Sequence, residues 1–131
     1  LARFLNERGR FPEGLALAER SLPDLRRGLA GEPSHFEWKG ALIEADIQRG
    51  IALAGLGRDR EARESWMEAL ALLAPIANDT DLLAPRAAYA ETLLLLGRTE
   101  EARPAAEQVL ARGWGDPLFL RLCRRAGFAP A

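Results

Sequence analysis

The sequence predicts an all-α protein built from antiparallel helix pairs, and three observations lead to that prediction. An octet at 56–63, Leu-Gly-Arg-Asp-Arg-Glu-Ala-Arg, returns 40 residues later at 96–103 as Leu-Gly-Arg-Thr-Glu-Glu-Ala-Arg, with six positions identical. Each copy follows a Leu-rich segment and precedes an Ala-rich one, and a degenerate copy stands at 9–14. Apolar residues between the copies recur at three- and four-residue steps, which indicates helices. Repetition at this distance is typical of helical arrays.

The octet has the composition of a corner between two helices. Gly57 and Gly97 follow periodic apolar runs, where the end of a helix favours a residue that accepts positive φ. Asp59 and Thr99 come two residues later, and their side-chain oxygens predict N-caps for the next helix. Acidic residues then fall in its first turn, where they complement the helix dipole. We therefore expect a tight helix-turn-helix corner at each octet.

Proline and small polar residues mark the other helices of the first half. Pro12 predicts the start of a helix that reaches Gly31, with a kink at Pro23. Ser34 predicts the N-cap of a long helix over 35–56. That long helix is apolar on two sides, as expected of a helix packed between neighbours.

The second half follows the same logic. The Asn-Asp-Thr segment at 78–80 predicts a loop, and the nearly all-apolar helix predicted over 81–96 is expected to be buried. Asp116 predicts the N-cap of a last helix that ends at Gly127. Outward arginines on this helix, about 117–126, are typical of a capping helix that covers the end of an array.

These residues resemble the tetratricopeptide repeat, in which two helices meet at a glycine and pack through small residues. The middle copy fits at Gly50, Leu53, Gly57, Ala62, Trp66, Ala69 and Pro75. The last copy fits at Ala90, Leu93, Gly97 and Ala102, with Ala106 and Val109 in place of the aromatic and the small residue. The first copy fits at Ala2, Leu5 and Gly9.

Two features depart from the family pattern. Its period is about 34 residues, whereas the glycines of the corners here are 48 and 40 residues apart. Asp46 and Arg86 stand where the family has an aromatic residue near the start of the first helix. The resemblance implies one domain over 1–131, a short right-handed solenoid of about seven helices. Its expected parts are repeat units at about 1–31, 34–75 and 80–112, and the capping helix at about 117–126.

Composition narrows the functional classes. The chain of 131 residues is 48% hydrophobic and 28% charged, which is typical of a soluble globular protein. A formal net charge of −1 gives no general attraction to nucleic acid or anionic membrane. The single cysteine agrees with a reducing compartment, so a cytoplasmic location is expected. Every basic residue except Lys39 is arginine, which suggests a bacterial source. The segment 1–9 has the pattern of the second half of a helix, which predicts that the chain is the C-terminal part of a longer protein.

The sequence offers little chemistry. One histidine and one cysteine do not predict a metal centre, which needs several converging ligands. There is no glycine-rich phosphate loop and no Gly-x-Ser-x-Gly nucleophile elbow. We therefore predict neither an enzyme nor a bound cofactor.

Binding is expected instead in the concave groove that the first helices line in this family. The resemblance assigns as exposed groove positions Glu44, Ile47, Gln48, Ile51, Ala84, Ala87 and Glu91. The alternative is that Ile47 and Ile51 pack on a neighbouring helix.

The leading functional hypothesis is a noncatalytic module that binds a protein or peptide, as a monomer or as a weak dimer through an open N-terminal face. The alternative is a structural or dimerising C-terminal segment of a multidomain enzyme or regulator. A helix-turn-helix nucleic-acid binder is disfavoured by the near-neutral charge and by the buried character of the second helices.

Overall fold

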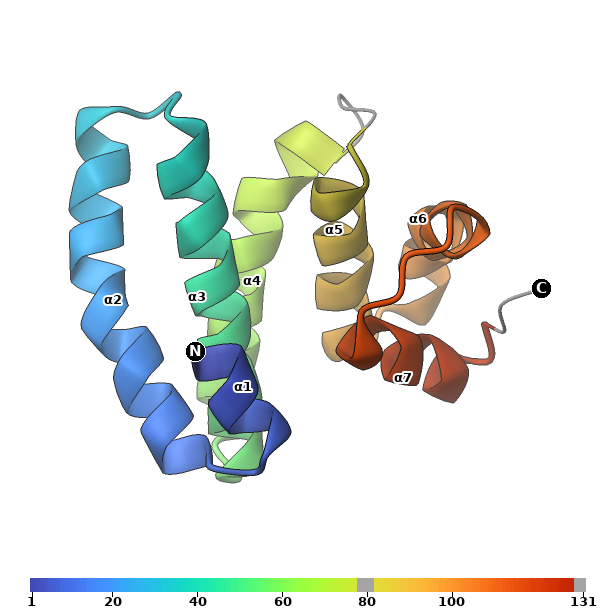
Figure 1. Ribbon diagram of the computed structural model, residues 1–131, viewed down its shortest axis with the longest axis horizontal. Coiled ribbons are helices and arrows are strands. Elements are labelled where there is room, and N and C mark those ends of the chain that lie inside the picture. The colour runs from blue at the N-terminus through green and yellow to red at the C-terminus, as the bar shows by residue number, and fades with distance from the viewer. Residues whose placement is uncertain (78–81, 129–131) are drawn as a thin grey trace. The chain divides into compact units, whose positions relative to one another are not determined.

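A computed structural model describes residues 1–77 and 82–128, the side chain of Phe36 apart. The predicted all-α class is confirmed, since every regular element among these residues is a helix (Figure 1). The predicted loop at 78–80 lies outside the described residues. The elements are α1 (Ala2–Glu7), α2 (Phe11–Gly31), α3 (Phe36–Gly55), α4 (Asp59–Ala77), α5 (Leu83–Leu95), α6 (Thr99–Ala111) and α7 (Pro117–Ala126).

The chain contains two compact units, which we name unit 1 (residues 1–72) and unit 2 (residues 73–131). Unit 1 holds α1, α2, α3 and most of α4, and unit 2 holds the end of α4 with α5, α6 and α7. The single domain and the right-handed solenoid order stay predictions.

The three predicted corners share one backbone geometry. Gly57 and Gly97 have φ values of 79° and 76°, as the sequence predicted, and Gly9 has a φ of 75°. In each corner the amide of the residue after the glycine donates to the carbonyl of the residue five positions before it in the sequence, at 2.8, 2.9 and 2.9 Å. This is the Schellman arrangement, in which the left-handed residue is favourable only for glycine. The degenerate first copy therefore forms the same kind of corner as the two octets.

The helices that follow the two octet corners, α4 and α6, begin differently from the prediction. Asp59 and Thr99 are the first helical residues of α4 and α6 and are not N-caps; the N-cap of α6 is Arg98, which makes no side-chain cap bond. The arginine after each glycine instead forms an ion pair with the glutamate three residues later. These pairs are Arg10–Glu13, Arg58–Glu61 and Arg98–Glu101.

Two other caps can be compared with their predictions. The prediction of Ser34 as the N-cap of α3 was wrong, because His35 takes that place and its Nδ1 accepts the amide of Trp38 at 3.3 Å. Asp116 caps α7 as predicted, accepting the amide of Phe119 at 3.0 Å. Gly127 ends α7 with φ of 85°, also as predicted.

In unit 1, α2 and α3 run side by side in opposite directions, and α1 packs against both (Figure 1). Small residues set how closely the helices approach. A Cβ added at Gly50 of α3 would lie 2.2 Å from Nε1 of Trp66 on α4, so the indole occupies the space that glycine leaves. The same Nε1 donates to the carbonyl of Ile47 at 3.2 Å. α2 continues through Pro23 as one helix.

Unit 2 has a core formed by α5, α6 and α7. Phe119 and Cys123 of α7 are fully buried in it, and α7 packs on α5. The arginines at 121, 124 and 125 are exposed, as expected of a helix with a polar outer face. The buried residues of this unit 2 core are Ala87, Ala90, Ala106, Val109, Phe119, Cys123 and Phe128.

Candidate functional site

The four predicted groove residues on α3 do not share one exposed surface. Glu44 is exposed and Ile51 is half-buried. The predicted exposure of Ile47 and Gln48 was wrong, since they are 0% and 2% exposed. Ile47 packs inward, and its carbonyl binds the indole of Trp66, which is the packing alternative left open by the sequence. Gln48 is covered because α1 lies over it.

The three predicted residues on α5 lie in unit 2 and likewise do not share one exposed surface. Ala84 is exposed, whereas Ala87 and Glu91 are 2% and 4% exposed. Ala87 belongs to the core that contains Phe119 and Cys123 of α7, and Glu91 lies one helical turn further along α5. α7 therefore covers part of the face that the resemblance assigned to the groove.

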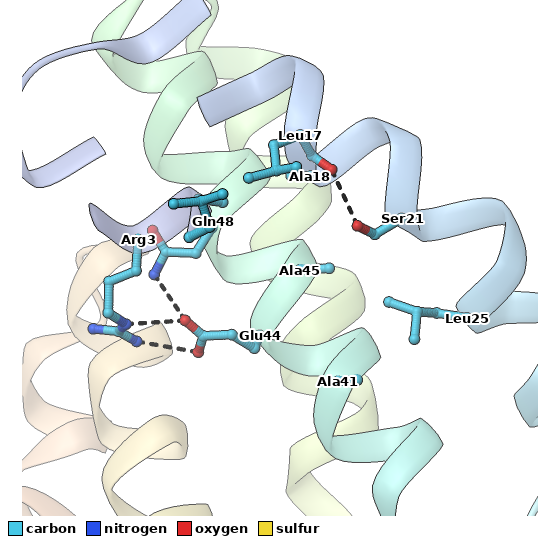
Figure 2. Close-up of a pocket in the computed structure, with 11 residues that line it drawn as sticks. Arg3, Leu17, Ala18, Ser21, Leu25, Ala41, Glu44, Ala45 and Gln48 are labelled. Carbon is cyan, nitrogen blue, oxygen red and sulfur yellow. Dashed lines mark hydrogen bonds and ion pairs between the residues drawn. The ribbon is translucent and has the colours of Figure 1, made fainter. Parts of the chain in front are cut away.

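Unit 1 has an open groove of about 430 Å³ between α2 and α3, beside the first residues of α1 (Figure 2). Its α2 wall carries Leu17 and Leu25, and its α3 wall carries Ala41 and Ala45. On α2 the lining residue Ser21 lies four positions from each leucine, and on α3 the two alanines are also four positions apart. Residues at this spacing share one face of a helix, so each wall is a single stripe. Ala41 is exposed and Ala45 is half-buried, and their short side chains leave room in the groove.

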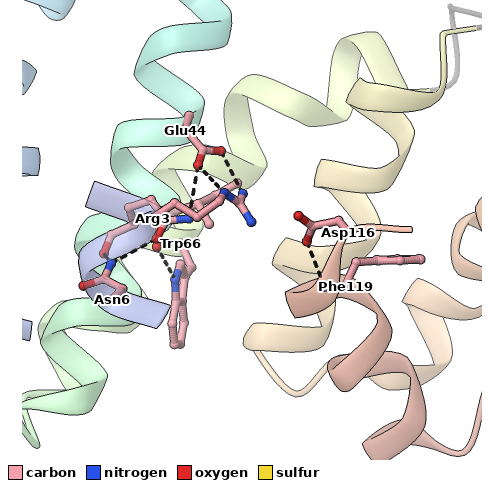
Figure 3. Close-up of polar contacts among 8 residues, drawn as sticks. Arg3, Asn6, Glu44, Trp66, Asp116 and Phe119 are labelled. Carbon is pink, nitrogen blue, oxygen red and sulfur yellow. Dashed lines mark hydrogen bonds and ion pairs between the residues drawn. The ribbon is translucent and has the colours of Figure 1, made fainter. Parts of the chain in front are cut away.

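Polar residues close the groove at the α1 end, where they form a ladder of hydrogen bonds (Figure 3). The guanidinium of Arg3 donates to both carboxylate oxygens of Glu44, at 3.0 and 3.1 Å. The amide of Gln48 donates to Glu44 at 3.1 Å. Asn6 donates to the side-chain and main-chain oxygens of Gln48, both at 3.0 Å. Two predicted residues, Glu44 and Gln48, thus do line a groove, but with α1 as the partner.

Sequence reasoning missed Arg3 and Asn6. One signal for Asn6 was available, because Gly14 lies inside a helix, where glycine is unfavourable without a reason. A Cβ at Gly14 would lie 2.2 Å from Oδ1 of Asn6. Glycine here permits the close approach of α1 to α2.

A second polar cluster lies where α2, α3 and α4 meet. Arg26 of α2 donates to Glu68 of α4 at 2.9 Å and lies 3.9 Å from Oδ1 of Asp46 on α3. Asp46 is 1% exposed, and neither of its oxygens accepts a hydrogen bond from the described residues. Desolvation raises the pKa of Asp46 from 3.8 to about 8, reinforced by hydrogen bonding to Glu68 and by its charge. The pKa of Glu68 is lowered, first because Asp46 donates to it and further because Arg26 does.

Arg49 extends this cluster along α3. Its guanidinium donates to the hydroxyl of Ser65 on α4, and its Nε lies 3.5 Å from the carboxylate of Glu19 on α2. The cluster therefore draws charged groups from all three helices.

The Cys123 thiol and the potential metal ligands show no feature of a reactive site among the described residues. Burial, followed by the charge of Glu91, raises the pKa of the Cys123 thiol from 9.0 to about 11, so little thiolate forms at neutral pH. Among residues 1–77 and 82–128, no cluster of three or more His, Cys, Asp or Glu side chains could hold a metal ion. The groove itself offers apolar walls and one charged end, which suits binding.

Within the described part of the chain, no helix is both long and apolar enough to cross a membrane. Comparisons of the chain with protein-family models, with curated proteins and with solved structures found no match.

Proposed function

We propose that this chain is a tetratricopeptide-like repeat protein and that its unit 1 groove binds an α-helical segment of a partner protein without catalysis. The proposed family rests on the quoted residues and on the three corners of identical geometry. A cytoplasmic location and a lack of nucleic-acid partners belong to the same proposal.

One observation carries the choice of a helix as the ligand. α1 is itself a helix, and it packs against both α2 and α3. The groove lies between the same two helices and begins at the first residues of α1. It therefore continues an existing helix-binding interface, and helices laid into apolar grooves are a common recognition mode.

The walls indicate the character of the partner helix. Leu17 and Leu25 would contact large apolar residues of the partner helix that are spaced three or four residues apart. The alanines of α3 would permit the partner helix to approach closely. Glu44 remains exposed while paired with Arg3, and Glu37 lies one turn before Ala41 on α3. Two carboxylates on the α3 side favour a partner helix with a basic flank.

The experiment is a display selection of helical peptides against the whole chain, followed by affinity measurements on variants. Ser21 is an exposed residue of the groove, so Ser21→Trp should fill it without disturbing the core. Arg20→Trp is the matched control, because Arg20 is exposed on the same helix and does not line the groove. Circular dichroism confirms that both variants are folded.

We expect the selected peptides to bind with one-to-one stoichiometry and to lose at least about tenfold in affinity for Ser21→Trp, which corresponds to ~1.4 kcal/mol. Affinity for Arg20→Trp should be unchanged. Peptides that bind both variants equally would place their site elsewhere and end the proposal.

One observation favours the second candidate, a segment that associates through its N-terminal face. Phe4 of α1 is 48% exposed, which is unusual for a large apolar side chain. Sedimentation equilibrium separates the two functions, since a dimer that dissociates in a Phe4→Ser variant supports association through α1. A monomer at all concentrations eliminates this candidate.

A further inference from the structure

We infer that the α2–α3–α4 junction of unit 1 is a proton-dependent lock, in which Asp46 must carry a proton for the three helices to pack as they do. The inference does not depend on what the groove binds. It starts from the position of Asp46, which is 1% exposed and whose carboxylate oxygens accept no hydrogen bond from the described residues. An ionised carboxylate left buried without donors is strongly unfavourable.

The nearest cation does not satisfy Asp46. Arg26 lies 3.9 Å from it, beyond hydrogen-bond distance, and is committed to Glu68 at 2.9 Å. Side chains of Arg26 and Glu68 are also 51% and 40% exposed, so their pair remains in contact with solvent. The charge of Arg26 therefore reaches Asp46 without replacing the water that burial removed.

The charges facing Asp46 can be counted by helix. α2 supplies Arg26, α4 supplies Glu68, and α3 supplies Arg49, which in turn pairs with Glu19 of α2. With Asp46 protonated, two guanidinium groups balance two carboxylates. With Asp46 ionised, the junction carries one uncompensated negative charge. The extra charge would sit on Asp46, the one fully buried ionisable member of the cluster, so a neutral cluster requires the proton.

The proton also has an acceptor. A protonated Asp46 donates to the carboxylate of Glu68, which Arg26 binds at the same time. When the proton leaves, no bond is made in exchange, and two carboxylates from α3 and α4 repel each other across the junction. Rising pH therefore loosens α3 from α4, and falling pH restores the lock.

The direction of the linkage follows from the two states. The pKa of Asp46 is 3.8 without its folded environment and about 8 within it. Between these values the folded state binds one more proton than the unfolded state, so its stability falls as pH rises and becomes level above about pH 8. The contribution of Asp46 to the unfolding equilibrium constant should rise about tenfold for each pH unit in this window.

The test compares urea unfolding of wild type, Asp46→Asn and Asp24→Asn from pH 5 to 9. Asparagine imitates the protonated acid, since its amide can donate to Glu68 without titrating. Asp24→Asn is the matched control, because Asp24 is an exposed aspartate of α2. The ratio of unfolding constants for wild type and Asp46→Asn should rise about tenfold per pH unit from pH 5 to 7, while Asp24→Asn follows wild type.

A second measurement needs no variant at Asp46. Carbon-13 detection of side-chain carboxyl groups in folded wild type should show one aspartate titrating well above pH 6. The proposal is overturned if every aspartate carboxyl carbon titrates below pH 5, or if the ratio of unfolding constants is level with pH. If Asp46→Asn does not fold, the carboxyl titration alone decides.

Discussion

Replacing Gly50 by alanine tests a close contact between α3 and α4 in unit 1. The new methyl group would lie 2.2, 2.5 and 2.7 Å from three atoms of the Trp66 indole, well inside van der Waals contact. Trp66 is 9% exposed and its Nε1 bonds to the carbonyl of Ile47, so the ring cannot move without losing that bond. The substitution should therefore shift α3 and α4 apart.

The magnitude follows from three opposing effects. Overpacking costs about 1–3 kcal/mol, and the lost hydrogen bond about 1 kcal/mol. Alanine regains about 1 kcal/mol because it favours helix more than glycine does. The expected result for Gly50→Ala is a loss of about 2 kcal/mol, measured by urea unfolding with circular dichroism and tryptophan fluorescence.

Gly40→Ala is the matched control on the same helix. Gly40 is exposed, and no described atom lies within 4 Å of an added Cβ. Only the propensity effect remains, so this variant should be stabilised by about 0.5–1 kcal/mol. Equal stability of the two variants would refute the contact between Gly50 and Trp66.

Two further predictions concern burial. Ile47→Ala should destabilise the protein by about 2–5 kcal/mol because Ile47 is 0% exposed, and Ile51→Ala should cost less because Ile51 is half-buried; similar losses in urea unfolding would contradict the assigned orientation of α3. Cys123 should react with a thiol reagent at pH 8 about 100-fold more slowly than a free thiol, on its raised pKa alone, since a shift from 9.0 to about 11 leaves that much less thiolate. The rate should rise with pH up to about 11, and rapid labelling of the folded protein would show that Cys123 is accessible.

Local signals in the sequence were sufficient for the corners. Gly57 and Gly97 end their helices with positive φ because a Schellman turn needs a residue without a Cβ, and this requirement is readable from neighbouring residues alone. The N-caps predicted at Asp59 and Thr99 were wrong because α4 and α6 already begin at these residues, and the arginine one position earlier pairs with a glutamate of the first turn. Alternatives of this kind are close in energy, and the sequence does not rank them.

The groove could not be located in this way. Whether Gln48 is exposed depends on α1, and the face of α5 that holds Ala87 depends on α7. Burial of a helix face is decided by segments distant in sequence, whereas periodicity shows only that a face is apolar. Asp46 departs from the family pattern, which is visible in the sequence. Its desolvation depends on how three helices pack around it, which the sequence does not show.

The docking of α1 through polar contacts has a consequence for how unit 1 fluctuates. The ladder from Arg3 to Asn6 holds α1 through a few hydrogen bonds, several of them near solvent. Segments held in this way open locally at much lower free energy than the global unfolding of a domain. We therefore expect the amide hydrogens of α1 to exchange with deuterium before those of the other helices of unit 1. Each opening of α1 would also lengthen the groove between α2 and α3 for as long as it lasts.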